Sequence, residues 1–166
     1  MTIMNESTQD RELPATGLWK EVPEEIRRRL TAAGEFKSLT AGKYIAVQGK
    51  EFTSLVVVLA GKLRVTCHGH GDTVVLAELG PGDTVGEMSL IDPRPASANV
   101  RVEEGGAEIW EIADAHFEHF VEGDSVAGYA VMKMLARELC RRLRKDADHM
   151  LHREDQIRTR FRDMDY

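Results

Sequence analysis

The chain has 166 residues, of which 42% are hydrophobic and 30% charged, and its formal net charge is −6 at pH 7. This length is enough for one domain with a proper core and a helical extension. No apolar run approaches the ~20 residues that a membrane-spanning helix needs, and no signal peptide is evident. The acidic balance argues against a general nucleic-acid binder, which needs a basic surface. Residues 1–17 are mostly polar, and we expect them to form a disordered tail.

The cysteines and histidines give no metal-binding pattern. Cys67 and Cys140 fall in different predicted elements, so we expect free thiols in a reducing cytoplasm. The histidines occur as a pair in a glycine-rich hairpin and as two i,i+3 pairs on predicted helices, which are expected to be solvated. The sequence therefore predicts a cytoplasmic protein without a metal.

Short strands broken by glycine dominate the middle of the chain. A short helix at Val22–Gly34 comes first, with proline in its first turn and glycine at its end. Strands are then predicted at 55–59, 62–66, 73–77, 98–102 and 107–112, with turns at 60–61, 68–72, 80–83 and 104–106. This rhythm predicts a mainly β fold with flanking helices, organised as a jelly-roll-like β-barrel.

The last third of the chain is predicted to be helical. Asp114 can cap a helix that carries Phe117 and Phe120 on one face, and residues 123–125 end it. A second helix runs from about residue 126 to at least 151, with an apolar stripe in steps of four: Val131, Leu135, Leu139, Leu143, Ala147 and Leu151. At ~1.5 Å per residue this helix is nearly 40 Å long, more than a small barrel covers.

A second copy of the same helix is the economical cover for this stripe, so we expect a homodimer through residues 126–151. The alternative is a helix that folds back over its own barrel. The resulting division is a tail at 1–17, a barrel with its N-terminal and hinge helices at 18–122, a dimerisation helix at 123–155, and a charged tail at 156–166.

A glycine followed by a predicted short helix, near the middle of the chain, forms a potential anion site. Gly86 permits close backbone approach, and the first amides of a helix from Glu87 favour a phosphate. Glu87 adds a carboxylate acceptor suited to a sugar hydroxyl.

The whole segment from Gly86 to Asp92, with Pro95 and Ser97–Val100, resembles the phosphate-binding cassette of cyclic nucleotide-binding domains such as those of the catabolite activator and the protein kinase A regulatory subunit. The resemblance extends over about residues 18–151 and includes the glycines Gly42, Gly49, Gly61 and Gly82. It implies that Glu87 accepts a hydrogen bond from the ribose 2′-hydroxyl. It also implies phosphate contacts from the amides of Met88, Ser89 and Ala98 and from the Ser97 hydroxyl.

One position departs from the family pattern. Counted from Gly86, the arginine that grips the cyclic phosphate falls on Ala96, while Arg94 lies two residues earlier. Three outcomes stay open: Arg94 substitutes, the ligand binds weakly through amides and Glu87, or the cassette holds no cyclic nucleotide. At the base end, the resemblance places the adenine-reading residues near Asp146 and Ala147.

These residues leave two functions in view. One is a non-enzymatic sensor of cAMP or cGMP that signals through its C-terminal helix to an unidentified protein partner. The other is a ligand-free dimeric interaction module, or one for a different ligand. A transcription regulator would follow the long helix with a DNA-reading helix-turn-helix, and only residues 152–166 remain. We therefore expect neither DNA nor a membrane as partner.

Overall fold

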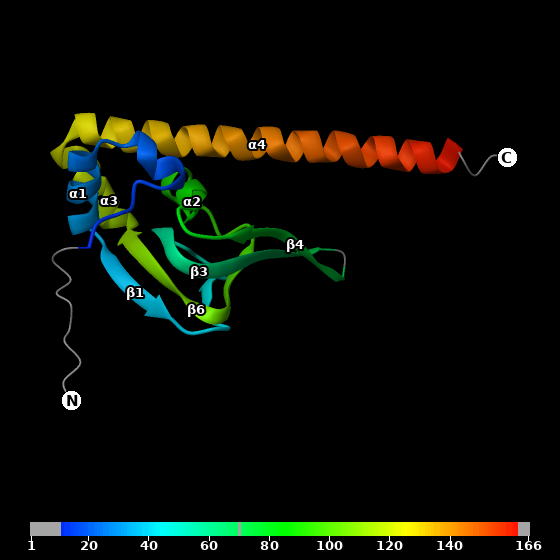
Figure 1. The fold of residues 1–166 in the computed structure, drawn as a ribbon, viewed down its shortest axis with the longest axis horizontal. Coiled ribbons are helices and arrows are strands. Elements are labelled where there is room, and N and C mark those ends of the chain that lie inside the picture. The colour runs from blue at the N-terminus through cyan, green and yellow to red at the C-terminus, as the bar shows by residue number, and fades with distance from the viewer. Residues whose placement is uncertain (1–10, 70, 163–166) are drawn as a thin grey trace. The chain divides into compact units, whose positions relative to one another are not determined.

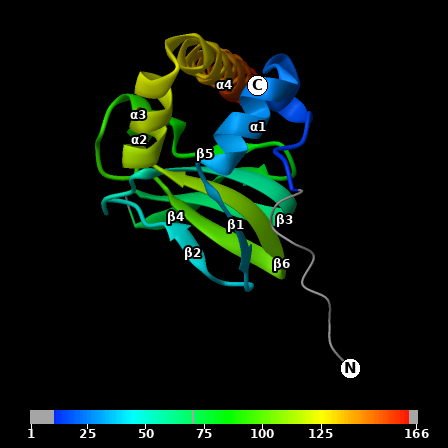
Figure 2. The same cartoon turned by 90° about the vertical axis from the view of Figure 1, so that its left-hand side faces the viewer.

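The computed structural model describes residues 11–69 and 71–162, the last eleven of these by their backbone alone. One antiparallel sheet forms the body of the fold, in the order β1-β6-β3-β4, with β2 paired to β6 and β5 to β3 (Figures 1 and 2). The strands are β1 (Glu35–Leu39), β2 (Tyr44–Ala46), β3 (Ser54–Gly69), β4 (Asp72–Leu79), β5 (Thr84–Val85) and β6 (Asn99–Ala113). This arrangement confirms the predicted mainly β fold with flanking helices.

Two predicted turns are instead bends inside long strands. β3 has 16 residues and β6 has 15, and each joins two strands that the sequence separates at Gly61 and at residues 104–106. The register between β3 and β6 shifts on both sides of Ala60, which is the signature of a bulge. A Cβ on Gly61 would lie 2.2 Å from the carbonyl oxygen of Gly106, so the glycines let the two bent strands approach each other. Glycine here bends a strand without ending it.

The interior of the sheet is apolar. Buried side chains from β2, β3, β5 and β6 form one cluster that includes Ala46, Val56, Val58, Leu63, Val85, Val100, Val102, Ala107 and Ile109. Half-buried side chains, among them Phe52, Val65, Leu79 and Ala96, pack against this cluster. The segment that leads into the predicted cassette therefore starts from the core, at β5.

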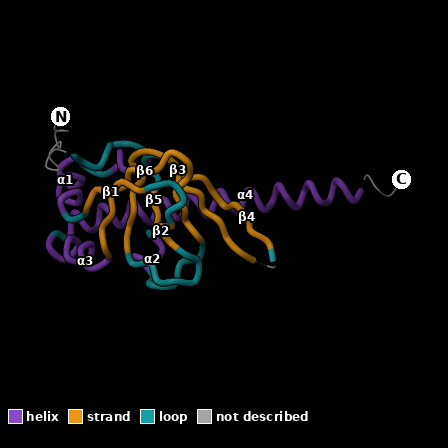
Figure 3. Tube along the Cα trace, turned by 90° about the horizontal axis from the view of Figure 1, so that it is seen from below, coloured by secondary structure: helices purple, strands orange, loops and turns teal. Residues whose placement is uncertain are grey.

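Helices flank the sheet. A 3₁₀ helix, η2 (Gly17–Glu21), precedes α1 (Glu24–Ala32), and both α1 and α3 (Asp114–Gly123) lie beside one end of the sheet (Figures 2 and 3). α2 (Glu87–Ile91) follows β5, and α4 (Ser125–Arg162) ends the described chain. Contacts divide the chain into two compact units, with the boundary between Met134 and Leu135 inside α4.

The helix caps differ from the sequence prediction. The N-cap residue of α3 is Ala113, and Asp114 lies one residue further on, within the helix. Asp124 instead caps α4, because its Oδ1 accepts 3.0 Å hydrogen bonds from the backbone N–H groups of Val126 and Ala127. The other carboxylate oxygen of Asp124 pairs with the guanidinium of Arg29 on α1. The start of α4 is therefore tied to the N-terminal helix.

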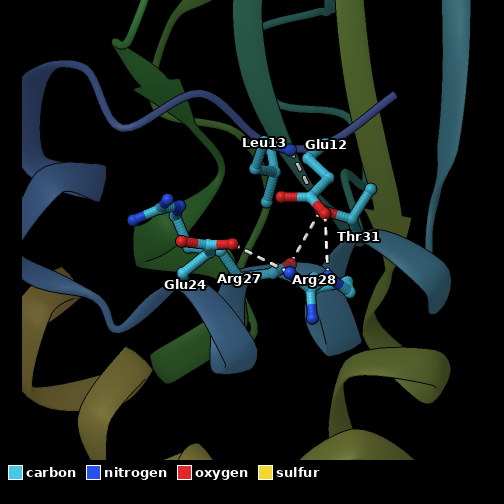
Figure 4. Close-up of polar contacts among 6 residues, drawn as sticks. All are labelled: Glu12, Leu13, Glu24, Arg27, Arg28 and Thr31. Atoms are coloured by element: carbon cyan, nitrogen blue, oxygen red, sulfur yellow. Dashed lines mark hydrogen bonds and ion pairs between the residues drawn. The ribbon is translucent and has the colours of Figure 1, made fainter. Parts of the chain in front are cut away.

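Part of the predicted N-terminal tail packs against α1 (Figure 4). Leu13 is only 1% exposed, and its N–H donates to Thr31 Oγ1 over 3.0 Å. Arg28 bridges Glu12 and Glu24, each at 2.8 Å. The predicted tail therefore differs from the structure over residues 11–16, while residues 1–10 lie outside the described range.

The α4 backbone continues through the first part of the predicted charged tail at 156–166, as far as Arg162. Residues 163–166 lie outside the described chain. None of the helices in the described chain has both the length and the apolar character that crossing a membrane requires.

Candidate functional site

Gly86 is the residue around which the cassette, residues 86–100, is built. Its φ is +96°, a left-handed conformation that favours glycine. A Cβ at this position would lie 2.0 Å from the carbonyl oxygen of Ser54 and 2.7 Å from the ring of Phe52. The backbone therefore turns from β5 into α2 in direct contact with β3, and only glycine fits there.

Glu87 is the first residue of α2 and is buried, with an exposed fraction of 3%. A carboxylate is rarely buried unless it is hydrogen-bonded, because removing it from water is costly. Its neighbours in the cassette are more accessible: Met88 is 59% exposed and Ser89 is half-buried. The structure thus places one acidic side chain of α2 inside the protein, at the position that the sequence singled out.

The later cassette residues form an ordered loop. Ala96 exchanges two backbone hydrogen bonds with the β2–β3 connection, because its N–H donates to the Lys50 carbonyl and its carbonyl accepts from the Gly49 N–H, both over 2.8 Å. Ser97 is exposed and Ala98 is half-buried. The side chain of Ala96 is half-buried and packs against the apolar cluster of the sheet.

Arg94 points away from the core. Its side chain is 78% exposed, and its Nε lies 2.7 Å from the carboxylate of Asp92, itself 67% exposed. An ion pair this exposed is weak, so Arg94 remains free to exchange partners at little cost. In sequence, Arg94 is the only lysine or arginine between Thr84 and Val100.

Asn99 is a site residue to which the sequence analysis gave no role. It is 6% exposed, and its Oδ1 accepts a 2.9 Å hydrogen bond from the backbone N–H of Gln48. This contact fixes the end of the cassette to the β2–β3 connection. The only available signal was an amide side chain at the start of an apolar strand.

Asp146 does not belong to the same unit as the cassette. It is exposed on α4 in the second compact unit, which begins at Leu135, and the other eight predicted residues belong to the first. Within residues 11–69 and 71–162, histidine, cysteine, aspartate and glutamate form no group of three that could hold a metal ion. His116 and His119 are both exposed on α3.

Residues 36–124 match the Cyclic nucleotide-binding domain family, and the chain belongs to this family. The Pycsar effector protein XpPycTIR of Xanthomonas perforans is a relative with 32% identity over 120 residues. That match covers 72% of this chain but only 38% of the relative, so the chain spans well under half of that protein's length.

Two solved structures show the same fold. The catabolite activator protein of Thermus thermophilus is similar with a TM-score of 0.66 and 27% identity, over 81% of this chain and 61% of that one. A cyclic nucleotide-binding domain from Methylobacillus flagellatus reaches a TM-score of 0.74 at 21% identity, over 79% of this chain and 74% of that one. The chain therefore has the fold of a cyclic nucleotide-binding domain.

Proposed function

We propose that this protein is a non-enzymatic sensor that binds a cyclic nucleotide, cAMP or cGMP, in the cassette and signals through α4 that the nucleotide is bound. The proposal rests on one observation: position 86 accepts only glycine, and the next residue, Glu87, has a buried carboxylate. This pairing occurs in a chain of the cyclic nucleotide-binding family. The module would work in the cytoplasm and act on a protein partner.

Glu87 is proposed to accept a hydrogen bond from the ribose 2′-hydroxyl. A hydrogen bond to a charged group contributes about 1.5–3 kcal/mol, which is roughly a 10- to 150-fold change in Kd. Because the carboxylate is held inside the protein, little side-chain entropy is lost when the ligand binds. The site would therefore prefer a ribose ligand to its 2′-deoxy analogue.

The phosphate end is proposed to bind without a guanidinium. Counted from Gly86, the resemblance to the family places the phosphate-binding arginine at Ala96, which packs against the apolar cluster, and Arg94 pairs with Asp92 at the surface. A phosphate that enters this site loses water and gains backbone N–H donors but no forked pair of bonds from arginine. We therefore expect an affinity weaker than an arginine-bearing site would give.

Calorimetry with cAMP and its 2′-deoxy analogue tests the role of Glu87. In the unmodified protein, loss of the 2′-hydroxyl should weaken binding by roughly 10- to 150-fold. In Glu87→Gln the two ligands should bind within a few-fold of each other, because the charged acceptor is gone. Glu118→Gln removes an exposed carboxylate from α3 and serves as the control. An unchanged preference for ribose in Glu87→Gln would remove this role from Glu87.

A ligand-free interaction module is the second candidate. The contact of Ala96 with the apolar cluster and the outward position of Arg94 favour it. The two candidates separate in Ala96→Arg, which should raise the affinity for cAMP or cGMP if only the guanidinium is missing. No heat with either nucleotide, in the original protein and in Ala96→Arg, would support the ligand-free module.

The module is further proposed to act as a homodimer through α4. Large apolar side chains of this helix are exposed, including Tyr129 at 65% and Leu143 at 68%. Exposed apolar side chains in a row along one helix are the usual mark of an association surface. A dimer would give each bound nucleotide a helix pair to act on.

A further inference from the structure

A turn in the β2–β3 connection holds Ala96 through its backbone. Within residues 47–50, the N–H of Lys50 donates to the Val47 carbonyl over 3.0 Å, and Gly49 has a φ of +78°. The same turn binds the cassette, because the Gly49 N–H donates to the Ala96 carbonyl and the Ala96 N–H donates to the Lys50 carbonyl, both over 2.8 Å. The backbone of Lys50 is therefore fixed beside the position at which the resemblance places the phosphate-binding arginine.

A turn of the same kind occurs at residues 40–43, in the β1–β2 connection. The N–H of Lys43 donates to the Thr40 carbonyl over 3.3 Å, and Gly42 has a φ of +82°. This turn binds Val102 in the same pattern, with the Gly42 N–H donating to its carbonyl and the Lys43 carbonyl accepting from its N–H, both over 2.9 Å. Val102 lies in β6, outside the cassette, so Lys43 is a matched reference for the lysine of the first turn.

The cassette does not carry enough positive charge of its own to bind a phosphate. Residues 86–100 contain two carboxylates, Glu87 and Asp92, and one guanidinium, Arg94, so their net charge is −1. Arg94 is paired with Asp92 at the surface. A phosphate that enters beside the buried Glu87 loses water and is repelled by a like charge. A cation from outside the cassette would offset both costs.

Lys50 can supply this cation. Its side chain is exposed, and within residues 11–69 and 71–162 no carboxylate is paired with it. A lysine carries its ammonium roughly 6 Å from its Cα on a flexible four-carbon stem. An arginine at position 96 would start from the neighbouring backbone and extend over a similar length. The two side chains can therefore bring a positive charge to the same place.

The arginines of the adjacent strands lie on the wrong face of the sheet. Arg101 alternates with Val100 and Val102, which belong to the apolar cluster, so its side chain lies on the opposite face. Arg64 is the cross-strand partner of Arg101 and shares that face, where its guanidinium lies 2.7 Å from the carboxylate of Glu103. Neither arginine is placed to reach the cassette from the side of the cluster.

We propose that Lys50 provides the positive charge that binds the phosphate of the nucleotide, in place of an arginine at position 96. The inference rests on the proposed function, and it names the residue that makes the site selective for an anionic ligand. An ammonium is a compact point charge, whereas a guanidinium donates a forked pair of hydrogen bonds. Binding through Lys50 therefore depends strongly on ionic strength.

Calorimetry with cAMP and cGMP on two matched variants tests the role of Lys50. Lys50→Gln should weaken binding roughly 10-fold or more, because a hydrogen bond to a charged group is lost. Lys43→Gln removes the same charge from the equivalent turn and should bind nucleotide as the parent protein does. Both variants keep the backbone hydrogen bonds of their turns, so urea unfolding should give equal stabilities. An unchanged affinity in Lys50→Gln, or an equal loss in both variants, would overturn the proposal.

A double-variant cycle separates a phosphate contact from a structural role. Ala96→Arg should raise the affinity more in Lys50→Gln than in the parent, because in the parent the positive charge is already present. Equal gains in the two backgrounds would refute the shared role. Lys50→Arg should retain binding, and the affinity of the parent should fall more steeply with added NaCl than that of Lys50→Gln. Parallel salt dependences would count against Lys50 in the same way.

The proposed function and the role of Lys50 fail in different ways. If the parent binds a nucleotide and Lys50→Gln binds it equally well, Lys50 has no role and the sensor stands. If neither the parent nor Ala96→Arg gives heat with cAMP or cGMP, the sensor is refuted, and the role of Lys50 is refuted with it.

Discussion

Replacing Gly86 by alanine tests whether the cassette needs a residue without a side chain. Two costs add at this position. The left-handed backbone at φ +96° costs about 1–2 kcal/mol for a residue with a Cβ. The new Cβ would also lie 2.0 Å from the Ser54 carbonyl oxygen, and overpacking of this kind typically costs about 1–3 kcal/mol. We expect Gly86→Ala to lose about 2–5 kcal/mol of unfolding free energy in total.

Gly42→Ala is the matched control. Gly42 has a similar φ of +82°, but a Cβ there would meet no atom within 4 Å. It should lose only the backbone cost of about 1–2 kcal/mol. The unfolding free energy of both variants can be measured by urea titration with tryptophan fluorescence as the signal, since Trp19 and Trp110 are fully buried. Equal losses in the two variants would refute the argument that β3 closes the space beside Gly86.

Two further predictions concern the N-terminal segment and the start of α4. Leu13→Ala should lower the unfolding free energy by about 2–5 kcal/mol in the same urea titration, because it leaves a cavity at a buried position. The control is Glu12→Ala at the adjacent exposed residue, which should lower the unfolding free energy by less than about 1 kcal/mol. Backbone hydrogen bonds from α4, chiefly from Ala127, and the pairing with Arg29 hold the pKa of Asp124 below its usual range. Its stabilising charge is therefore fully present above about pH 4 and is lost as the pH falls through the lowered value. The stability advantage of the parent protein over Asp124→Asn should shrink between pH 7 and pH 2.5, and a pH-independent difference would contradict this assignment.

The sequence predicted the class of fold because alternating apolar residues and glycine spacing both report on strands. It placed strand breaks at Gly61 and at residues 104–106, where the structure has bends in continuous strands. Local composition cannot distinguish these cases. A glycine with positive φ serves a turn and a bulge equally well, and only the pairing of β3 with β6 decides between them.

The turn at Gly86 could be predicted from the sequence, because a glycine before an acidic residue and a short helix is typical of such a turn. The structure shows why the residue must be glycine: a side chain there would collide with the Ser54 carbonyl oxygen. The direction of Arg94 was not predictable, because it depends on the ion pair with Asp92. The spacing of apolar residues along α4 likewise does not tell which of them the chain itself buries: Val131 is buried, whereas Leu143, in the same stripe, is exposed.

Trp110 has a consequence for dissecting this protein into smaller pieces. The family match begins at residue 36, yet the indole N–H of Trp110 donates to the Thr31 carbonyl over 3.1 Å, and its ring occupies the space that a side chain at Gly34 would need. We therefore expect the smallest autonomous folding unit to be larger than residues 36–124, the region that the family match covers. An expression fragment trimmed to residues 36–124 would expose an indole that the intact chain buries completely, and would be a poor substitute for the intact chain in any binding assay.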